Sequence, residues 1–205
     1  MKRMLAYSSI VQISYIGLGM GMANPLGFTG AVLHILNHAF MKGALFLVAA
    51  NLRKNSGHSD ILKLDASYRQ KLPFTMAAFT VAALSMIGLP PTAGFFSKWY
   101  LALAALERSN WVFVAVILVS SLLNAVYFFR ILERVYLVQA DHEKKGGKLH
   151  DRASGKSSVM GEEEYTLMIP AVVLSFSLLL LGLWNANIVK GIIQRIIPLG
   201  METLR

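Results

Sequence analysis

Long apolar runs constrain the fold of this chain more than any other feature. Of its 205 residues, 55% are hydrophobic and only 15% are charged, and the mean hydropathy is +0.53. Helical runs of about 20 apolar residues span the hydrocarbon core of a bilayer. Because lipid offers no hydrogen bonds to the backbone, such segments cross it as helices. The sequence therefore predicts an all-α integral membrane protein.

The apolar segments are separated by polar loops or by prolines. We expect helices over residues 4–22, 28–52, 73–89, 94–106, 111–136 and 165–184. A basic loop follows the second helix, and a polar loop over residues 138–164, expected on the cytoplasmic side, precedes the last helix. The remaining tail, KGIIQRIIPLGMETLR, is amphipathic and is expected to lie along the membrane interface.

The stretch GLPPTAGF interrupts the apolar sequence at Pro90 and Pro91, with Gly88 and Gly94 on either side. If residues 73–107 form one interrupted crossing, 14 of the 20 lysines and arginines lie on the side of the N-terminus and four lie opposite. Two separate crossings would give an 11 to 7 split. The positive-inside rule favours the first topology. It predicts five crossings, one of them a discontinuous helix broken at Pro90-Pro91, with the N-terminus in the cytoplasm.

The segment HILNHAFMKGALF places His34, His38 and Lys42 four residues apart. Residues at this spacing share one face of a helix, so the three form a stripe roughly 12 Å long. Charged groups at bilayer depth cost a few kcal/mol or more unless they are paired or hydrated. Lys98, just beyond the Pro90-Pro91 break, is a second lysine of this kind.

Three interpretations of this stripe remain open. A metal site on His34 and His38 would use the i, i+4 spacing, but every carboxylate of the chain is expected in a loop, at a helix end or in the tail. The groups could instead hydrogen-bond across helices and hold the bundle together. We favour a proton relay through His34, His38, Lys42 and Lys98, since imidazole changes charge near neutral pH and loss of water favours a neutral amine.

Other chemistry finds little support in the sequence. The chain has no cysteine, which excludes disulfides, Fe–S clusters and thiolate zinc sites. We find no nucleophile elbow, phosphate loop or redox-cofactor motif, so no catalytic centre, metal or cofactor is predicted. The net charge of +9 indicates a basic cytoplasmic face rather than a nucleic-acid partner.

Two further helices carry polar side chains at i, i+4 and i+7. Such stripes commonly join helices, and here they could also hold water between Lys42 and Lys98. The stripes are Ser8, Gln12 and Tyr15 on the first helix and Ser120, Asn124 and Tyr127 on the fifth.

Three stretches, KRMLAYSSIVQISYIGLG, HILNHAFMKGALFLVAANL and GLPPTAGFFSKWYL, resemble successive signatures of one family. That family is the antiporter-like membrane subunits, which comprises the D-type subunits of Mrp sodium/proton antiporters and the pumping subunits of complex I and membrane-bound hydrogenases. The resemblance runs from Lys2 to about Tyr136 and weakly into the last helix. Within the family, GFFSKWYLALAAL and SSLLNAVYF look closest to the Mrp branch.

The resemblance implies inverted repeats, each with a broken helix and half of an ion channel. Residues 1–137 would be the second repeat, and residues 165–205 would follow it as a final membrane helix and tail. Lys42 would match the central relay lysine, and His34 and His38 the histidines that link it onward. Lys98 would match the ionisable residue on the second broken helix, where protons exit.

The first repeat of such subunits has no counterpart in this sequence, so the resemblance implies at most one half-channel. We therefore expect a multi-pass subunit in the cell membrane of a prokaryote, within a redox-driven or Mrp-type complex that moves protons or sodium. Other membrane subunits would be its partners, and a separate chain would supply the missing N-terminal half. The alternative is a non-conducting structural paralogue that fills the membrane arm of such a complex.

Overall fold

The computed structural model describes residues 2–56, 66–137 and 162–193, and these residues form helices joined by short turns, without a strand among them. The predicted all-α class is therefore confirmed. The helices are α1 (Lys2–Gly21), α2 (Pro25–Ser56), α3 (Ala66–Lys71), α4 (Pro73–Ile87), α5 (Ala93–Glu107), α6 (Trp111–Tyr136), α7 (Glu162–Leu183) and α8 (Asn185–Ile188), followed by the π-helix η3 (Val189–Ile193).

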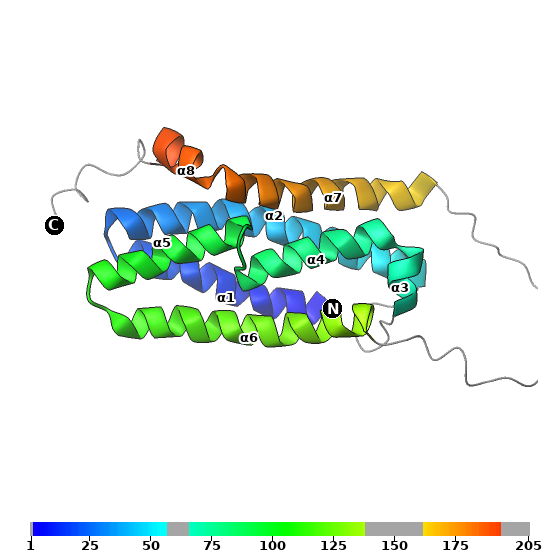
Figure 1. Ribbon diagram of the computed structural model, residues 1–205, viewed down its shortest axis with the longest axis horizontal. Coiled ribbons are helices and arrows are strands. Elements are labelled where there is room, and N and C mark those ends of the chain that lie inside the picture. Colours follow the sequence, from blue (N-terminus) through cyan, green and yellow to red (C-terminus); the bar gives the residue numbers. More distant parts are fainter. Residues whose placement is uncertain (1, 57–65, 138–161, 194–205) are drawn as a thin grey trace, which may run out of the picture.

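The long helices run roughly side by side, and α4 and α5 lie end to end along the bundle (Figure 1). Helix α2 contacts α1, α4, α5 and α7, so it is the central element. Helices α4 and α5 together contact α6 on one side and α7 on the other. The helix that carries His34, His38 and Lys42 is thus the one most enclosed by its neighbours.

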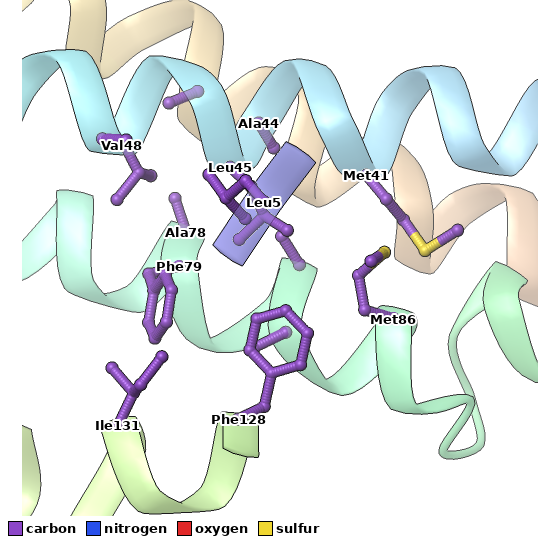
Figure 2. Close-up of a cluster of buried hydrophobic side chains, with 14 of the residues drawn as sticks. Leu5, Met41, Ala44, Leu45, Val48, Ala78, Phe79, Met86, Phe128 and Ile131 are labelled. Carbon is purple, nitrogen blue, oxygen red and sulfur yellow. The ribbon is translucent and has the colours of Figure 1, made fainter. Parts of the chain in front are cut away.

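The largest core cluster gathers apolar side chains from α1, α2, α4, α6 and α7. Figure 2 shows Leu5 and Leu45 near the α1–α2 contact, and Phe79 and Phe128 between α4 and α6. The ring centroids of Phe79 and Phe128 are 6.3 Å apart. Because lipid tails are as apolar as these side chains, close packing rather than escape from water holds such helices together.

Glycine permits the close contact between α1, α2 and α5. A Cβ atom on Gly19 would lie 2.7 Å from the carbonyl oxygen of Gly27 and 2.6 Å from Leu101 Cδ2. A Cβ atom on Gly30 would lie 2.9 Å from the same leucine side chain. Small residues at these positions let the three backbones approach.

The turn between α1 and α2 meets the turn between α5 and α6. Asn24 Nδ2 donates to the carbonyl of Ala104 at 3.0 Å and to Glu107 Oε2 at 2.8 Å. Arg108 Nη2 donates to the carbonyl of Ala23 at 3.0 Å. Both turns lie at one end of the bundle, whereas α3 and the C-terminal end of α6 lie at the other (Figure 1). Helices α4 and α5 together therefore traverse the same length as α6.

Within the part of the chain that the structure describes, three helical segments are long and apolar enough to cross a membrane: Pro25–Asn55, Trp111–Tyr136 and Tyr165–Leu183. Helix α4 is apolar but shorter than a full crossing. Helix α1 is continuous, but serines and Gln12 interrupt its apolar sequence. The chain is a multi-pass membrane protein by these segments. The count of five crossings and the discontinuous crossing remain predictions.

Some elements differ from the expected ones. Helix α2 begins at Pro25, because a proline in the first turn lacks an N–H that would need a partner. Helix α3 lies within the predicted basic loop, and the guanidinium of Arg69 stands 5.5 Å from the Tyr136 ring centroid. The predicted polar loop is outside the described residues except for its last three, which belong to α7.

The predicted tail is described only as far as residue 193. Val189 and Ile193 are buried in a small cluster with Leu33 of α2. The start of the tail therefore packs on the bundle, and the remainder lies outside the described residues.

Candidate functional site

The predicted break separates α4 from α5. Helix α4 ends at Ile87, and Gly88 follows with φ of 92°, a left-handed conformation that favours glycine. The Gly88 N–H donates to the carbonyl of Leu84 at 3.0 Å, which closes the helix end. Pro90 and Pro91 lack an N–H group, so they cannot continue the helix. Helix α5 resumes at Ala93, one residue before Gly94.

Lys98 donates hydrogen bonds to the C-terminal end of α4, where the break leaves carbonyl groups without helical partners. Its Nζ donates to the carbonyls of Met86 at 2.9 Å and Ile87 at 3.0 Å, and to Ser121 Oγ at 3.1 Å. The last carbonyls of a helix have no partner within it and carry the negative end of its dipole. The buried amino group of Lys98 thus takes the place of the missing helical N–H donors of these two carbonyls.

Neighbouring helices hold the other end of the break. Asn37 Nδ2 of α2 donates to the carbonyl of Ala93 at 2.7 Å. The N–H of Gly94 donates to Ser85 Oγ at 3.2 Å, and a Cβ atom on Gly94 would collide with the Ser85 carbonyl. Helix α7 also touches the break, since a Cβ atom on Gly182 would meet backbone atoms of residues 91–93.

The ionisable stripe of α2 faces the interior of the bundle. His34 is fully buried, while Lys42 and Lys98 are only 7% and 6% exposed. His38 is half-buried, and its ring lies parallel to that of His34 with the centroids 6.4 Å apart. The four residues are therefore enclosed among the helices and do not point outward.

Each end of the stripe contacts α1. Lys42 Nζ donates to the carbonyl of Leu5 and to Ser8 Oγ. At the other end, His34 Nε2 lies 3.0 Å from Gln12 Oε1, and its Nδ1 lies 2.9 Å from Ser97 Oγ of α5. The predicted polar stripe of α1 thus lies along the stripe of α2.

Tyr15 connects His34 to Lys98. Its ring meets the His34 ring edge-on, with the centroids 5.4 Å apart. Lys98 Nζ stands 5.2 Å from the centroid of the same tyrosine ring, a cation–π arrangement. The two histidines and the two lysines therefore lie among buried and half-buried polar side chains of α1, α2, α5 and α6, which together we call the polar seam. Its members are Ser8, Gln12, Tyr15, His34, His38, Lys42, Ser97, Lys98, Ser121, Asn124 and Tyr127.

Four buried polar atoms of the seam have no hydrogen-bond partner among the described residues. They belong to α1, α2 and α6 and are Gln12 Nε2, Tyr15 Oη, His38 Nε2 and Asn124 Nδ2. Buried polar groups in proteins are commonly satisfied by ordered water. The seam can therefore accept water at several points along its length.

The stripe predicted on α6 lies partly within the seam. Asn124 is buried, and its Oδ1 accepts a hydrogen bond from Tyr127 Oη at 2.7 Å. The hydroxyl that contacts Lys98 belongs to Ser121, whereas the predicted Ser120 is half-buried one residue earlier.

Three residues that fix the break were not predicted from the sequence: Asn37, Ser85 and Ser97. Asn37 lies one turn after His34 on the same helix, and Ser97 directly precedes Lys98. Their position beside His34 and Lys98 in the sequence was the signal that could have identified Asn37 and Ser97 as site residues.

Electrostatically, the seam contains basic and neutral groups only. Among the described residues, none of the buried ones is an aspartate or glutamate. Likewise, the described part of the chain holds no group of three or more histidine and carboxylate side chains that could bind a metal. Both ring nitrogens of His34 are already in hydrogen bonds, so this geometry gives the metal interpretation no support.

Comparison with known proteins decides the family. Residues 1–124 match a family model described as NADH:quinone oxidoreductase/Mrp antiporter, TM. The chain belongs to this family. The predicted resemblance is thereby confirmed, and the match includes α1, α2, the break and Lys98.

Relatives in this family include components of different complexes. The chain is 46% identical over 198 residues to the N-type subunit of NADH-quinone oxidoreductase from Desulforudis audaxviator, a match that covers 96% of this chain and 39% of the relative. It is 33% identical to the D-type subunit of the Na(+)/H(+) antiporter from Alkalihalophilus pseudofirmus, covering 70% of this chain and 29% of the relative. The higher identity to the NADH-quinone oxidoreductase relative does not support the predicted likeness to the Mrp branch.

Solved membrane complexes contain the same fold. A chain of the Mrp complex from Dietzia sp. DQ12-45-1b superposes with a TM-score of 0.74 and 26% identity, covering 91% of this chain and 40% of that one. A chain of the membrane-bound sulfane sulfur reductase, an archaeal respiratory complex, gives a TM-score of 0.69 and 26% identity over 91% and 34%. The chain thus spans between 29% and 40% of the length of these relatives.

Proposed function

We propose that this protein is a membrane subunit of a cation/proton translocating complex, redox-driven or of Mrp type, and that its polar seam forms the exit half of a proton path. The observation that carries the proposal is the enclosure of His34, His38, Lys42 and Lys98 in one seam. That seam also holds four buried polar atoms without a hydrogen-bond partner among the described residues. Ionisable residues inside a membrane bundle commonly mark ion pathways.

In this proposal a proton passes from Lys42 along His38 and His34 to Lys98, with bound water bridging the gaps. Two lysines without a buried carboxylate repel each other when both are charged. Arrival of a positive charge at one end therefore favours release of a proton at the other. In this proposal Lys98 releases its proton at the break between α4 and α5, since broken helices in membrane proteins commonly line water-filled cavities.

We further propose that α4 and α5 form one discontinuous crossing, so that the chain crosses five times with its N-terminus in the cytoplasm. The contacts of Asn24 with Glu107 and of Arg108 with Ala23 support this topology. They hold the α1–α2 turn and the α5–α6 turn at the same end of the bundle. The positive-inside rule then places the Arg53–Lys71 region in the cytoplasm.

The proposed setting is the cell membrane of a prokaryote, with other antiporter-like or complex I-like subunits as partners. The relatives extend well beyond the length that this chain matches. A separate chain that supplies the N-terminal half of the path stays a prediction, as does the choice between protons and sodium.

Replacement of either lysine tests the proposal. We expect Lys42→Ala and Lys98→Ala each to abolish proton transport by the purified complex in lipid vesicles, because a methyl group cannot carry a proton. Lys190→Ala serves as the matched control, since Lys190 is exposed on η3, and it should transport normally. Proton transport that survives both seam substitutions in an assembled complex would refute the relay.

A structural role is the second candidate, and one observation favours it. Each seam lysine binds backbone carbonyls on another helix, as a residue that holds the bundle together would do. Under this hypothesis the lysine substitutions would lower thermal stability and leave transport by the assembled complex unchanged. Lys98→Gln separates the two, because its amide can still donate to one carbonyl but cannot carry a proton.

A further inference from the structure

Gln12, in the middle of α1, is fully buried but uses only half of its side-chain amide. Its Oε1 lies 3.0 Å from His34 Nε2, whereas its Nε2 has no partner among the described residues. A buried amide nitrogen without a partner lowers stability. Its presence directly beside a relay histidine therefore calls for a physical reason.

The His34 contacts define two alternative hydrogen-bond patterns. The Gln12 oxygen can only accept, so in the first pattern the imidazole proton is on Nε2. Nδ1 must then accept the hydroxyl proton of Ser97, 2.9 Å away. The same hydroxyl also lies 3.1 Å from the carbonyl of Gly94, which can likewise only accept. One hydroxyl proton cannot serve both acceptors.

The second pattern resolves this competition. With the imidazole proton on Nδ1, His34 donates to Ser97 Oγ, and the Ser97 hydroxyl donates to the Gly94 carbonyl. His34 Nε2 then becomes an acceptor. A half-turn of the Gln12 amide about its terminal bond presents the unpartnered NH₂ group to it, without any movement of the backbone.

We propose that Gln12 is a positioning residue whose amide turns over with the His34 tautomer, so that each tautomer is hydrogen-bonded at both ring nitrogens. The inference rests on the proposed relay. In the proposed relay, bound water delivers a proton to one ring nitrogen and accepts the proton released from the other, so each passage leaves the ring uncharged but in the opposite tautomer. The ring must return to its first tautomer through the same water before the next proton passes in that direction. The amide turn lets the ring occupy both tautomers in sequence.

Nitrogen-15 NMR of the full chain in lipid bilayers, labelled at histidine, tests this proposal directly. The chain has five histidines, and the His34 signals are assigned by their loss in His34→Gln. The chemical shifts of Nδ1 and Nε2 report which nitrogen carries the proton. We expect both tautomers of His34 in the unmodified protein.

Two variants should move the tautomer ratio in opposite directions. Gln12→Met removes both the acceptor for an Nε2 proton and the donor to a bare Nε2; because a buried N–H without an acceptor is the costlier loss, the Nδ1 tautomer should be favoured by about tenfold. Ser97→Ala removes both partners of Nδ1 and, for the same reason, should favour the Nε2 tautomer by a similar factor. Ser14→Ala, on the exposed face of α1, is the matched control and should leave the ratio unchanged.

The proposal is overturned if His34 shows a single tautomer that neither variant changes, or if only its doubly protonated form is seen. If Gln12→Met does not fold, the response of Ser97→Ala alone decides. Transport measurements separate this inference from the proposed function. A ratio that responds while Lys98→Ala still transports protons would refute the relay only, and an unresponsive ratio with transport lost in Lys98→Ala would refute the amide switch only.

Discussion

Lys98 reaches back across the break to the last two carbonyls of the helix that precedes it. Carboxylate partners are absent among the buried residues that the structure describes, and the negative end of the α4 dipole takes their place. Such an arrangement stabilises the ammonium without neutralising it. The sequence predicted that Lys98 lies beside the break. Its carbonyl partners could not be predicted, because they depend on the direction in which the chain leaves Gly88.

Gly88 can be tested by a single substitution. Gly88→Ala should lower the free energy of unfolding by roughly 1–2 kcal/mol, because φ at this position is 92° and is unfavourable for any residue with a Cβ atom. The new Cβ would also lie 3.1 Å from Lys98 Cδ. Denaturant unfolding in detergent measures the change, and Gly88→Leu should disturb assembly further.

Gly17→Ala is the control for this substitution. A Cβ atom there meets nothing within 4 Å, and the residue is inside α1. Alanine should therefore leave stability equal or slightly higher. Equal stability of Gly88→Ala and the unmodified protein would contradict the conformational argument.

At the scale of elements, the long apolar helices were predictable and the short polar ones were not. The expected ranges 73–89, 94–106 and 111–136 agree within two residues with α4, α5 and α6. Helix α3 has the sequence ASYRQK, which carries no apolar periodicity, and its position against α6 depends on tertiary contacts. Similarly, the choice of Ser121 over Ser120 depends on the rotation of α6, which sequence spacing alone does not fix.

The contact between α2 and the start of α5 can be tested through Asn37. Asn37→Leu keeps the side-chain size but removes the hydrogen bond from α2 to the carbonyl of Ala93. The free energy of unfolding should fall by about 0.5–1.5 kcal/mol, the usual net contribution of one hydrogen bond. Thermal unfolding provides the measurement. Asn187→Leu, at an exposed position on α8, should change stability by less than about 0.5 kcal/mol.

For the molecule as a whole, the outer surface is as informative as the seam. The exposed side of α6 is lined by large apolar side chains, among them Leu118, Leu122 and Leu123, each more than 60% exposed. Such a surface suits lipid or a neighbouring membrane subunit. The bundle therefore has an apolar exterior and a polar interior seam, the reverse of a soluble protein.

The proposed topology, with α4 and α5 as one interrupted crossing, can be tested by labelling. The chain has no cysteine, so single cysteines can be introduced and labelled with a membrane-impermeant reagent. Lys71→Cys should react from the cytoplasmic side and Ser109→Cys from the opposite side, since both positions are exposed at opposite ends of the bundle. Labelling of both from the same side would rule out a single interrupted crossing by α4 and α5.

The glycine at position 182 has a mechanical consequence. Because α7 rests directly on the peptide groups of residues 91–93, with no side chain between them, it braces the kink from one flank. The kink cannot widen in that direction unless the whole of α7 recedes. Any opening that admits water to the break is therefore expected on the opposite side, where Tyr15 and Ser121 contact Lys98. The position of α7 thus determines the side on which the break can open.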